Sequence, residues 1–468
     1  MQQLLNPFAQ KYPEAVDCTL SSQATSVRFN PSGPYAGHYL AAGGSDGLVE
    51  VWDVETRGIV RQLEGHVKAV GGLSWSRNNR FLLSTSLDGT AIIWDLAPLS
   101  PLLRQRVGAT WPRKRTLRFD APLSTGAFHP RNAGIILLTL ACNEVVLVDL
   151  RGQAPSEGGQ RWVLEDVMEG EGDGEEEGEP AKKRQALTCA AWSPCGSRIY
   201  AGTNGGMVLV IDPVSRLVQS RIKVGTSGIK QLAFDGAGRN LILNSTDRAL
   251  RVLTVSPQTG ALAPIHRFQD LVNRTPWHAV GFSGDGEYVF GGAGHKMSHN
   301  VFVWDREAGA LVKVLEGPKE SLMDADWHPT RPIIATVENS GDVHIWQTSS
   351  PDNWAAFAPG FEELEENVEY DEREDEFDIE DEDDAARKMN EAEDEVIDVL
   401  SPADDFPRRP EPALGAAGAA EHDEEDEAAR AARLVRAAAE WADAQPDDDG
   451  WEGFYLSIDL LEEPIENE

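Results

Sequence analysis

The stretch that decides the fold is VGGLSWSRNNRFLLSTSLDGTAIIWD, at Val70–Asp95. Small, apolar and polar residues alternate into Trp75, a polar turn follows, and a later apolar run ends in Trp94-Asp95. Before that last run stands Asp88-Gly89, a strong hairpin signal because both residue types accept the backbone angles of a tight turn. The stretch therefore predicts antiparallel strands joined by short turns.

The same pattern occurs seven times along the chain. In each copy an aromatic residue ends the first alternating run, and these residues are Phe29, Trp75, Phe128, Trp192, Phe234, Phe282 and Trp327. Their successive spacings are 46, 53, 64, 42, 48 and 45 residues, against a period of about 40–45 for WD repeats. The two long spacings must contain insertions, one of which includes the Gly- and Glu-rich stretch 166–185. Three copies also close with the Trp-Asp dipeptide, at Trp52-Asp53, Trp94-Asp95 and Trp304-Asp305.

Seven strand–turn–strand copies predict an all-β fold, a seven-bladed WD-repeat β-propeller. We expect four-stranded blades over about residues 20–350, within a domain of residues 1–350, and an N-terminal stretch that helps to close the ring. His66, a hydroxyl from the strand around Ser84, Asp88 and Trp94 are expected to form a buried hydrogen-bond network. Because buried polar groups are normally satisfied in this way, His66 is interpreted as structural and not as a catalytic base.

Acidic charge is concentrated in the C-terminal part of the chain. Residues 361–468 contain 41 Asp and Glu against 8 Lys and Arg, whereas the whole chain has 78 against 42. Such a stretch buries too little apolar surface to offset its ordering entropy. We therefore expect a linear partner-binding segment at 351–400, followed at 401–468 by an acidic, mostly disordered tail with a short helix at Ala428–Ala444.

Sequence patterns of catalysis and metal binding are absent. The chain has no Gly-rich phosphate loop, no nucleophile elbow and no HExxH motif. His295 and His299 are four residues apart in a polar turn, without an indicated third ligand. The four cysteines include no C-x-x-C pair, the start lacks a signal peptide, and no apolar run reaches 18 residues. We expect an intracellular binding protein that is not an enzyme and that has no metal, cofactor, membrane or small-molecule partner.

Apolar side chains interrupt the acidic sequence after residue 360. They are Phe361, Leu364, Val368, Tyr370, Phe377 and Ile379. A purely solvating tail does not need such residues. Spaced apolar anchors within acidic sequence are typical of a segment that becomes ordered on a partner, with the anchors buried and the charge steering the encounter.

Three pieces of the sequence carry a resemblance to a known family: Leu5-Asn6-Pro7-Phe8, Asp270–Trp277 and Asn367–Glu380. Over most of residues 1–382 the chain resembles the retinoblastoma-binding-protein-five family, the propeller subunit of COMPASS-type (SET/MLL) histone methyltransferase complexes, in its fungal form. The resemblance implies a nuclear, non-catalytic scaffold that joins the SET-domain subunit to the SPRY domain of the Ash-two-like subunit. It also implies that the scaffold stimulates methylation of lysine four of histone three on nucleosomes.

The resemblance further implies which tail residues contact each partner. The SET domain would be contacted by Phe361, Leu364, Asn367 and Val368. The SPRY domain would be contacted by Glu369, Tyr370, Glu372, Arg373, Glu374, Phe377, Asp378 and Ile379. A companion WD-repeat propeller would be bound by Val396, Ile397, Asp398 and Val399.

Three arginines, Arg248, Arg251 and Arg274, stand out against a nearly neutral propeller. Turns and inter-blade loops lie at the rim of a propeller, so one interpretation is that these side chains converge on phosphates of nucleosomal DNA. The alternative is that each arginine pairs with a neighbouring carboxylate.

Two other functions remain open, a substrate receptor of a ubiquitin ligase and a histone chaperone that uses the acidic tail. The ligase receptor would need an adaptor-binding helix or a basic degron pocket, and the sequence indicates neither. The chaperone interpretation rests on the acidic tail alone.

Overall fold

The computed structural model describes residues 10–33, 35–96, 113–151, 159–167, 185–270, 275–294, 299–348 and 421–444. The chain forms two units, one of Met1–Ser349 with Asp423–Glu468 and one of Ser350–His422. Of the second unit, only the first two residues of helix α3 (Glu421–Asp443) are described. All the strands, and the rest of α3, therefore belong to the first unit.

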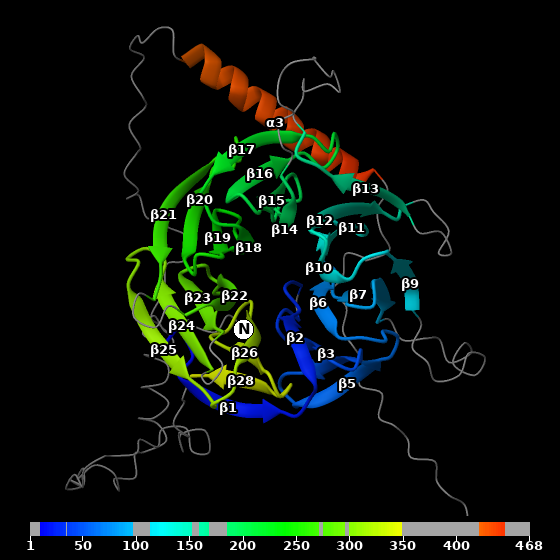
Figure 1. The fold of residues 1–468 in the computed structure, drawn as a ribbon, viewed down its shortest axis with the longest axis vertical. Helices are drawn as coiled ribbons and strands as arrows, with labels where there is room; N and C mark the ends of the chain where they lie inside the picture. The colour runs from blue at the N-terminus through cyan, green and yellow to red at the C-terminus, as the bar shows by residue number, and fades with distance from the viewer. Residues whose placement is uncertain are drawn as a thin grey trace, which may run out of the picture. The chain divides into compact units, whose positions relative to one another are not determined.

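Seven four-stranded antiparallel sheets surround a common centre (Figure 1), so the predicted seven-bladed β-propeller is confirmed. Blades 1 to 3 are β2(Ala24–Phe29)–β3(Tyr39–Gly44)–β4(Val49–Asp53)–β5(Gly58–Leu63), β6(Val70–Trp75)–β7(Phe81–Ser86)–β8(Thr90–Asp95)–β9(Arg113–Arg118) and β10(Leu123–His129)–β11(Asn132–Leu140)–β12(Glu144–Asp149)–β13(Gln160–Leu164). Blades 4 and 5 are β14(Leu187–Trp192)–β15(Ile199–Thr203)–β16(Met207–Ile211)–β17(Val218–Lys223) and β18(Ile229–Phe234)–β19(Asn240–Ser245)–β20(Leu250–Val255)–β21(Leu262–Phe268). Blades 6 and 7 are β22(Trp277–Phe282)–β23(Tyr288–Ala293)–β24(Asn300–Asp305)–β25(Leu311–Glu316) and β26(Leu322–Trp327)–β27(Ile334–Glu338)–β28(Val343–Gln347)–β1(Ala15–Leu20).

The seven repeated aromatic residues all lie at or next to the end of the innermost strand of a blade. Trp75, at the end of β6, is 6% exposed and packs between blades 1 and 2 with Tyr39 and Leu82. Each of the apolar clusters in the described residues likewise joins two neighbouring sheets. The core is therefore a ring of inter-blade layers, and a blade buries its faces only when both neighbours are present.

The ring is closed by the N-terminal strand, as the sequence predicted. β1 pairs antiparallel with β28, with Val16 opposite Trp346 and Leu20 opposite Val343, and the two strands lie side by side in Figure 1. Blade 7 thus combines strands from the two ends of the propeller, which secures the junction between the first and last blades.

A buried hydrogen-bond network around Ser84 connects the strands of blade 2. Its hydroxyl lies 2.7 Å from His66 Nε2 and accepts a hydrogen bond from Trp94 Nε1 at 2.8 Å. His66 Nδ1 lies 2.8 Å from the Thr90 hydroxyl, which in turn contacts Asp88. The network contains the residue types that the sequence indicated, and it engages both ring nitrogens of His66.

The same arrangement recurs in blade 7 around Thr336. Its hydroxyl lies 2.7 Å from His299 Nε2 and accepts a hydrogen bond from Trp346 Nε1 at 2.9 Å. His299 is fully buried, and desolvation lowers its pKa to about 4, so the imidazole is neutral at neutral pH. His299, one of the two histidines weighed as metal ligands, is therefore part of the blade core, while His295 lies outside the described residues.

Replacing Thr336 with Val keeps the shape of the side chain and removes the shared hydroxyl. Because buried donors without an acceptor cost roughly 1–3 kcal/mol each, we expect Thr336→Val to lower the free energy of unfolding by about 2 kcal/mol or more. Thr254→Val, at an exposed position of β20, is the matched control and should change stability little. Chemical denaturation checks both variants, and equal stabilities would contradict the role of the Thr336 hydroxyl.

Candidate functional site

The segments predicted to bind partners lie outside the described residues. This applies to the SET-facing residues from Phe361 to Val368, to the SPRY-facing residues from Glu369 to Ile379, and to Val396–Val399. Arg274 and most of the 166–185 insertion also fall outside them. These assignments stay predictions. The described propeller contributes pockets on its surface and the end of β28, at which the chain leaves the last blade.

Two of the three predicted nucleosome-facing arginines are described. Arg248 occupies a tight turn with φ +63°, and its carbonyl oxygen accepts a hydrogen bond from Trp277 Nε1 at 3.0 Å. The Arg251 guanidinium donates to the Ser245 hydroxyl at 2.8 Å and pairs with Asp247, leaving its side chain 15% exposed. Arg251 therefore shows the carboxylate pairing that the sequence left as an alternative, while the DNA-facing role of the set stays a prediction.

Arg251 also lines a groove between the outer parts of blades 4 and 5. The groove has a volume of about 290 Å³, with Leu253, Leu262 and Ile265 in its wall and Lys223 and Arg267 beside them. The groove therefore combines an apolar wall with positively charged side chains. Its lining also includes His266, whose Nε2 lies 3.1 Å from the carbonyl oxygen of Glu307.

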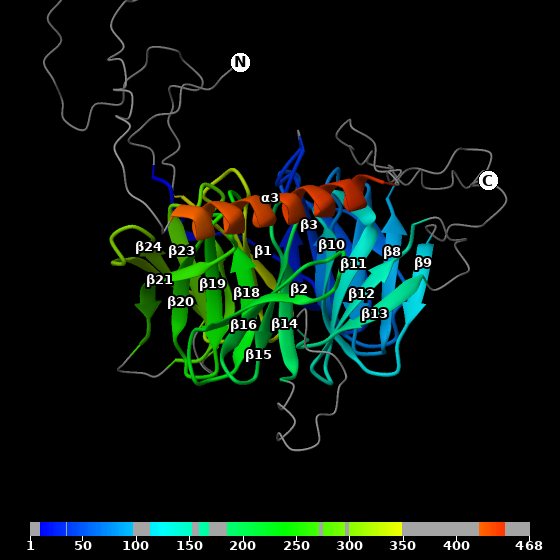
Figure 2. The same cartoon turned by 90° about the horizontal axis from the view of Figure 1, so that it is seen from above.

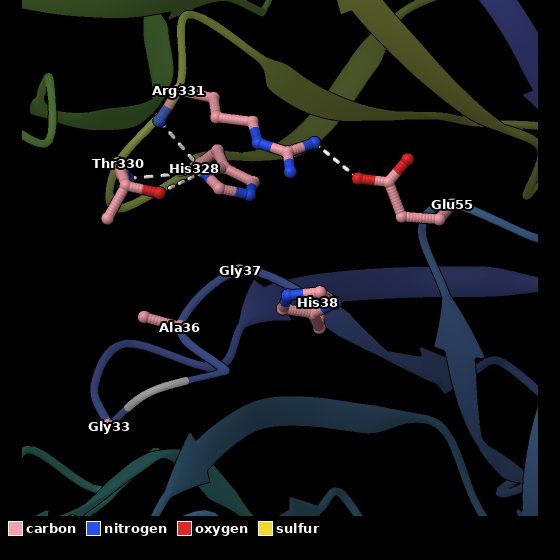
Figure 3. A pocket seen from close by; sticks show the side chains of 8 residues that line it. All are labelled: Gly33, Ala36, Gly37, His38, Glu55, His328, Thr330 and Arg331. Atoms are coloured by element: carbon pink, nitrogen blue, oxygen red, sulfur yellow. Dashed lines mark hydrogen bonds and ion pairs between the residues drawn. The ribbon is translucent and has the colours of Figure 1, made fainter. Parts of the chain in front are cut away.

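A small polar pocket of about 180 Å³ lies where blade 7 meets blade 1 (Figure 3). Figure 3 shows His328 and Arg331, from the turn after β26, facing the β2–β3 loop that carries Gly37. His328 Nδ1 accepts backbone N–H bonds from Thr330 and Arg331 at 3.1 and 3.0 Å, and burial lowers the pKa of the ring to about 4. Arg331 is paired with Glu55. The pocket thus presents a neutral imidazole and an ion pair.

The same joint occurs between blades 3 and 4. His129 Nδ1 accepts the backbone N–H of Arg131 at 3.1 Å, and its Nε2 lies 3.0 Å from the carbonyl oxygen of Gly196 in blade 4. In both joints the glycine has positive φ, and an added Cβ would stand only 2.0 Å from the ring of His328 or 2.5 Å from that of His129. A His-Pro dipeptide stands at both joints, at His129-Pro130 and His328-Pro329, and it marks a contact between two blades. The polar pocket is a consequence of this packing.

A carboxylate pair lies at the inner contact of blades 7 and 1. Asp324 pairs with Arg28 at 2.7 Å, and Asp326 Oδ2 accepts the backbone N–H of Phe29 at 2.8 Å. Desolvation raises the pKa of Asp326 to about 6, although the charge of Arg28 and the Phe29 hydrogen bond act in the opposite direction. A shifted carboxylate can indicate a catalytic acid, but these carboxylates hold β26 to β2.

Helix α3 ends in a polar socket on blade 3, formed by His129, Arg131, Asn132 and Arg151 and termed the α3 socket. The Asn132 side-chain amide donates to the carbonyl oxygen of Ala442 at 2.8 Å, and Arg151 donates to that of Trp441. The Arg151 guanidinium also lies 4.7 Å from the centre of the Trp441 ring. Arg131 pairs with Asp443 at the exposed edge. These donors satisfy carbonyl groups that a helix C-terminus leaves unpaired.

One face of α3 is buried by this contact. Ala431, Ala438 and Ala442 are 8%, 1% and 0% exposed, and their spacing places them on one side of a helix. Leu434, with Arg430 and Ala431, lines a cavity of about 310 Å³ against β17, and Figure 2 shows α3 lying across the strands of blades 3 and 4. Sequence reasoning predicted a short helix at Ala428–Ala444 and missed its contact, for which the spaced alanines and Trp441 were the available signal.

Among the residues that the structure describes, no group of three His, Cys, Asp or Glu side chains could hold a metal ion. Within the same residues no helix is long and apolar enough to cross a membrane. The arrangement of the described residues offers grooves, a helix socket and a fixed exit for the chain after β28.

Comparisons with known proteins agree with the repeat. The WD domain, G-beta repeat, matches residues 17–53, 57–95 and 309–347. The Set1 complex component swd1 of Schizosaccharomyces pombe is 37% identical over 385 residues, covering 81% of this chain and 90% of that protein. The retinoblastoma-binding protein 5 homolog of Drosophila melanogaster is 38% identical over 411 residues, covering 85% of this chain and 76% of that protein.

A solved structure is also similar. The crystal structure of the Cps50 (Swd1) β-propeller domain of Myceliophteria thermophila superposes with a TM-score of 0.61 at 34% sequence identity. It covers 71% of this chain and 99% of that domain. The propeller and its relatives therefore share both sequence and architecture.

The raised pKa of Asp326 gives a pH prediction. A carboxyl group whose folded pKa of about 6 exceeds its unfolded value of about 3.9 favours folding below pH 4, and this contribution disappears as the pH rises through 6. Relative to Asp326→Asn, the wild-type protein should lose up to about 2–3 kcal/mol of unfolding free energy between pH 4 and pH 7. Urea denaturation across this range measures it, with the exposed Asp120→Asn as control. Parallel profiles for wild type and Asp326→Asn would refute the assignment.

Proposed function

The chain belongs to the family of the Swd1 and retinoblastoma-binding protein 5 homologues, and from this premise we propose that it is a subunit of a Set1-type (COMPASS) histone methyltransferase complex in the nucleus. The observation that carries the proposal is the extent of the match. The matched 81% of the chain is a larger share than the part that ends at Ser349, so the similarity to swd1 includes some of the acidic sequence after the propeller.

Within that complex we assign the chain a scaffold role without catalysis. His66 and His299 are committed to blade cores, and His328 is committed to a blade joint. The methyl-transfer chemistry would belong to the SET-domain subunit. The contribution of this chain would be to bind that subunit and the Ash-two-like SPRY domain through residues 361–379.

The proposed mechanism is a population shift. A SET domain that moves between competent and incompetent arrangements becomes more active when a ligand binds the competent arrangement more tightly. The anchors Phe361, Leu364 and Val368 would supply that differential contact, because burying each large apolar side chain is worth about 1.5–3 kcal/mol. Ordering the segment costs conformational entropy, so several anchors are needed.

The remaining contacts of the scaffold follow the same reasoning. Val396–Val399 would bind a companion WD-repeat propeller, and Arg248, Arg251 and Arg274 would face the nucleosome. The methylated residue would be lysine four of histone three. These roles come from the family resemblance and from the charge pattern.

The binding segment can be tested directly. A peptide of residues 361–382 should bind an Ash-two-like SPRY domain, and combining Phe377→Ala with Ile379→Ala should weaken it at least tenfold, because two anchors of about 1.5–3 kcal/mol each are lost. Calorimetry measures the affinity, and Asp381→Ala is a control that removes charge without removing an anchor. If the double variant binds as tightly as the wild-type peptide, the assignment of the anchors is wrong.

A further inference from the structure

We propose that α3 is a clasp in cis, whose docking in the α3 socket closes residues 350–420 into a loop with both ends held on the propeller. The inference rests on the proposed function only in that the loop contains the partner-binding segment. The two points of attachment to the propeller do not depend on that function. They are the end of β28 at Gln347 and the end of α3 at Asp443 in the socket.

The α3 socket has the chemistry of a receptor for a helix C-terminus. The last carbonyl groups of a helix lack partners within the helix and carry partial negative charge. Arg151 and Asn132 donate to two such carbonyl groups, those of Trp441 and Ala442, and Asn132 is only 2% exposed. Donors to carbonyl groups at this end therefore favour a bound helix whose C-terminus points into the socket.

Trp441 adds recognition of a side chain to recognition of the backbone. Its ring lies under the Arg151 guanidinium at 4.7 Å and meets the ring of His129 edge-on at 6.2 Å, and His129 in turn packs against Trp192 at 4.6 Å. A cation over an indole and edge-to-face rings are both favourable contacts. The contact extends into the core, because Trp441 packs against the apolar cluster between blades 3 and 4.

The small side chains on the buried face of α3 allow the helix to pack closely against the propeller. Ala438 and Ala442 are 1% and 0% exposed, so a long or charged side chain at either position has no room when the helix is docked. Ala437, one residue before Ala438, is exposed. Substitutions at these two adjacent alanines therefore separate an effect on docking from an effect on helix formation.

Connectivity favours docking of α3 on its own propeller over docking on a second copy. A flexible linker gives a tethered ligand an effective concentration that reaches the millimolar range for short linkers and falls slowly with length. Residues 350–420 tether α3 covalently to its own propeller, whereas a second copy of a purified protein is normally present only at micromolar concentration. Because β28 and α3 are both held on the propeller, a partner bound between them in the sequence is tethered to the propeller at two points.

The test compares Ala438→Arg with the matched control Ala437→Arg in the full chain. Arg is a good helix former at both positions, but only Arg at 438 must bury a charge when α3 docks. Hydrogen exchange read by mass spectrometry should be on the order of tenfold faster in residues 430–443 of Ala438→Arg, and faster at the β10–β11 turn. Ala437→Arg should exchange like the wild type, and all three proteins should be monomers by mass photometry.

Two results would overturn the clasp. One is that hydrogen exchange in residues 430–443 is as slow in Ala438→Arg as in the wild type. The other is that protection depends on protein concentration and accompanies dimers, which would make the contact one between two copies. Binding of an Ash-two-like SPRY domain should be similar for both variants and the wild type, since its predicted motif is untouched. Absence of that binding in the wild type would count against the proposed function and leave the clasp standing.

Discussion

The junction between the first and last blades is the constraint on which the rest of the structure depends. A blade of four strands has two apolar faces, and the ring covers all of them only when its ends meet. Here β1 completes blade 7 beside β28, while Asp326 accepts a hydrogen bond from the backbone of β2. Because β28 is held between β27 and β1, the chain leaves the propeller at a fixed place, and the predicted partner-binding segment starts from it.

Buried polar side chains of the described propeller also hold its strands and blades together. His66 and His299 share hydroxyl groups with tryptophans inside blades 2 and 7, and His129 and His328 meet the turns of the following blades. Burial lowers the pKa values of His129, His299 and His328 to about 4, and such shifts would in another setting suggest catalysis. Here each imidazole is engaged by neighbouring main-chain or hydroxyl groups, so it contributes to the packing of the blades.

The architecture could be predicted from the sequence because its signals are local. An aromatic residue at the end of the inner strand repeats in every blade, so the pattern predicts even blade 5. That blade lacks the Trp-Asp dipeptide: Leu253 and Thr254 have the strand register that Trp94 and Asp95 have in blade 2. The contact of His328 with Gly37 and the docking of α3 join residues far apart in the sequence, and local patterns can mark one side of such a contact without identifying the other. The helix also begins at Glu421, earlier than predicted, since acidic residues stabilise the first turns of a helix without any apolar periodicity. The spaced apolar residues predict a partner-binding segment, whereas the assignment of individual residues to each partner rests on the family resemblance.

The central claim is that this chain acts by joining and activating other subunits. The most direct measurement is methyl transfer to histone three by a purified SET-domain subunit with an Ash-two-like subunit, with and without the full chain. The account predicts that the chain alone transfers no methyl group and that adding it raises the rate of the assembled pair at least tenfold. An unchanged rate, with all subunits present and folded, would contradict the scaffold role.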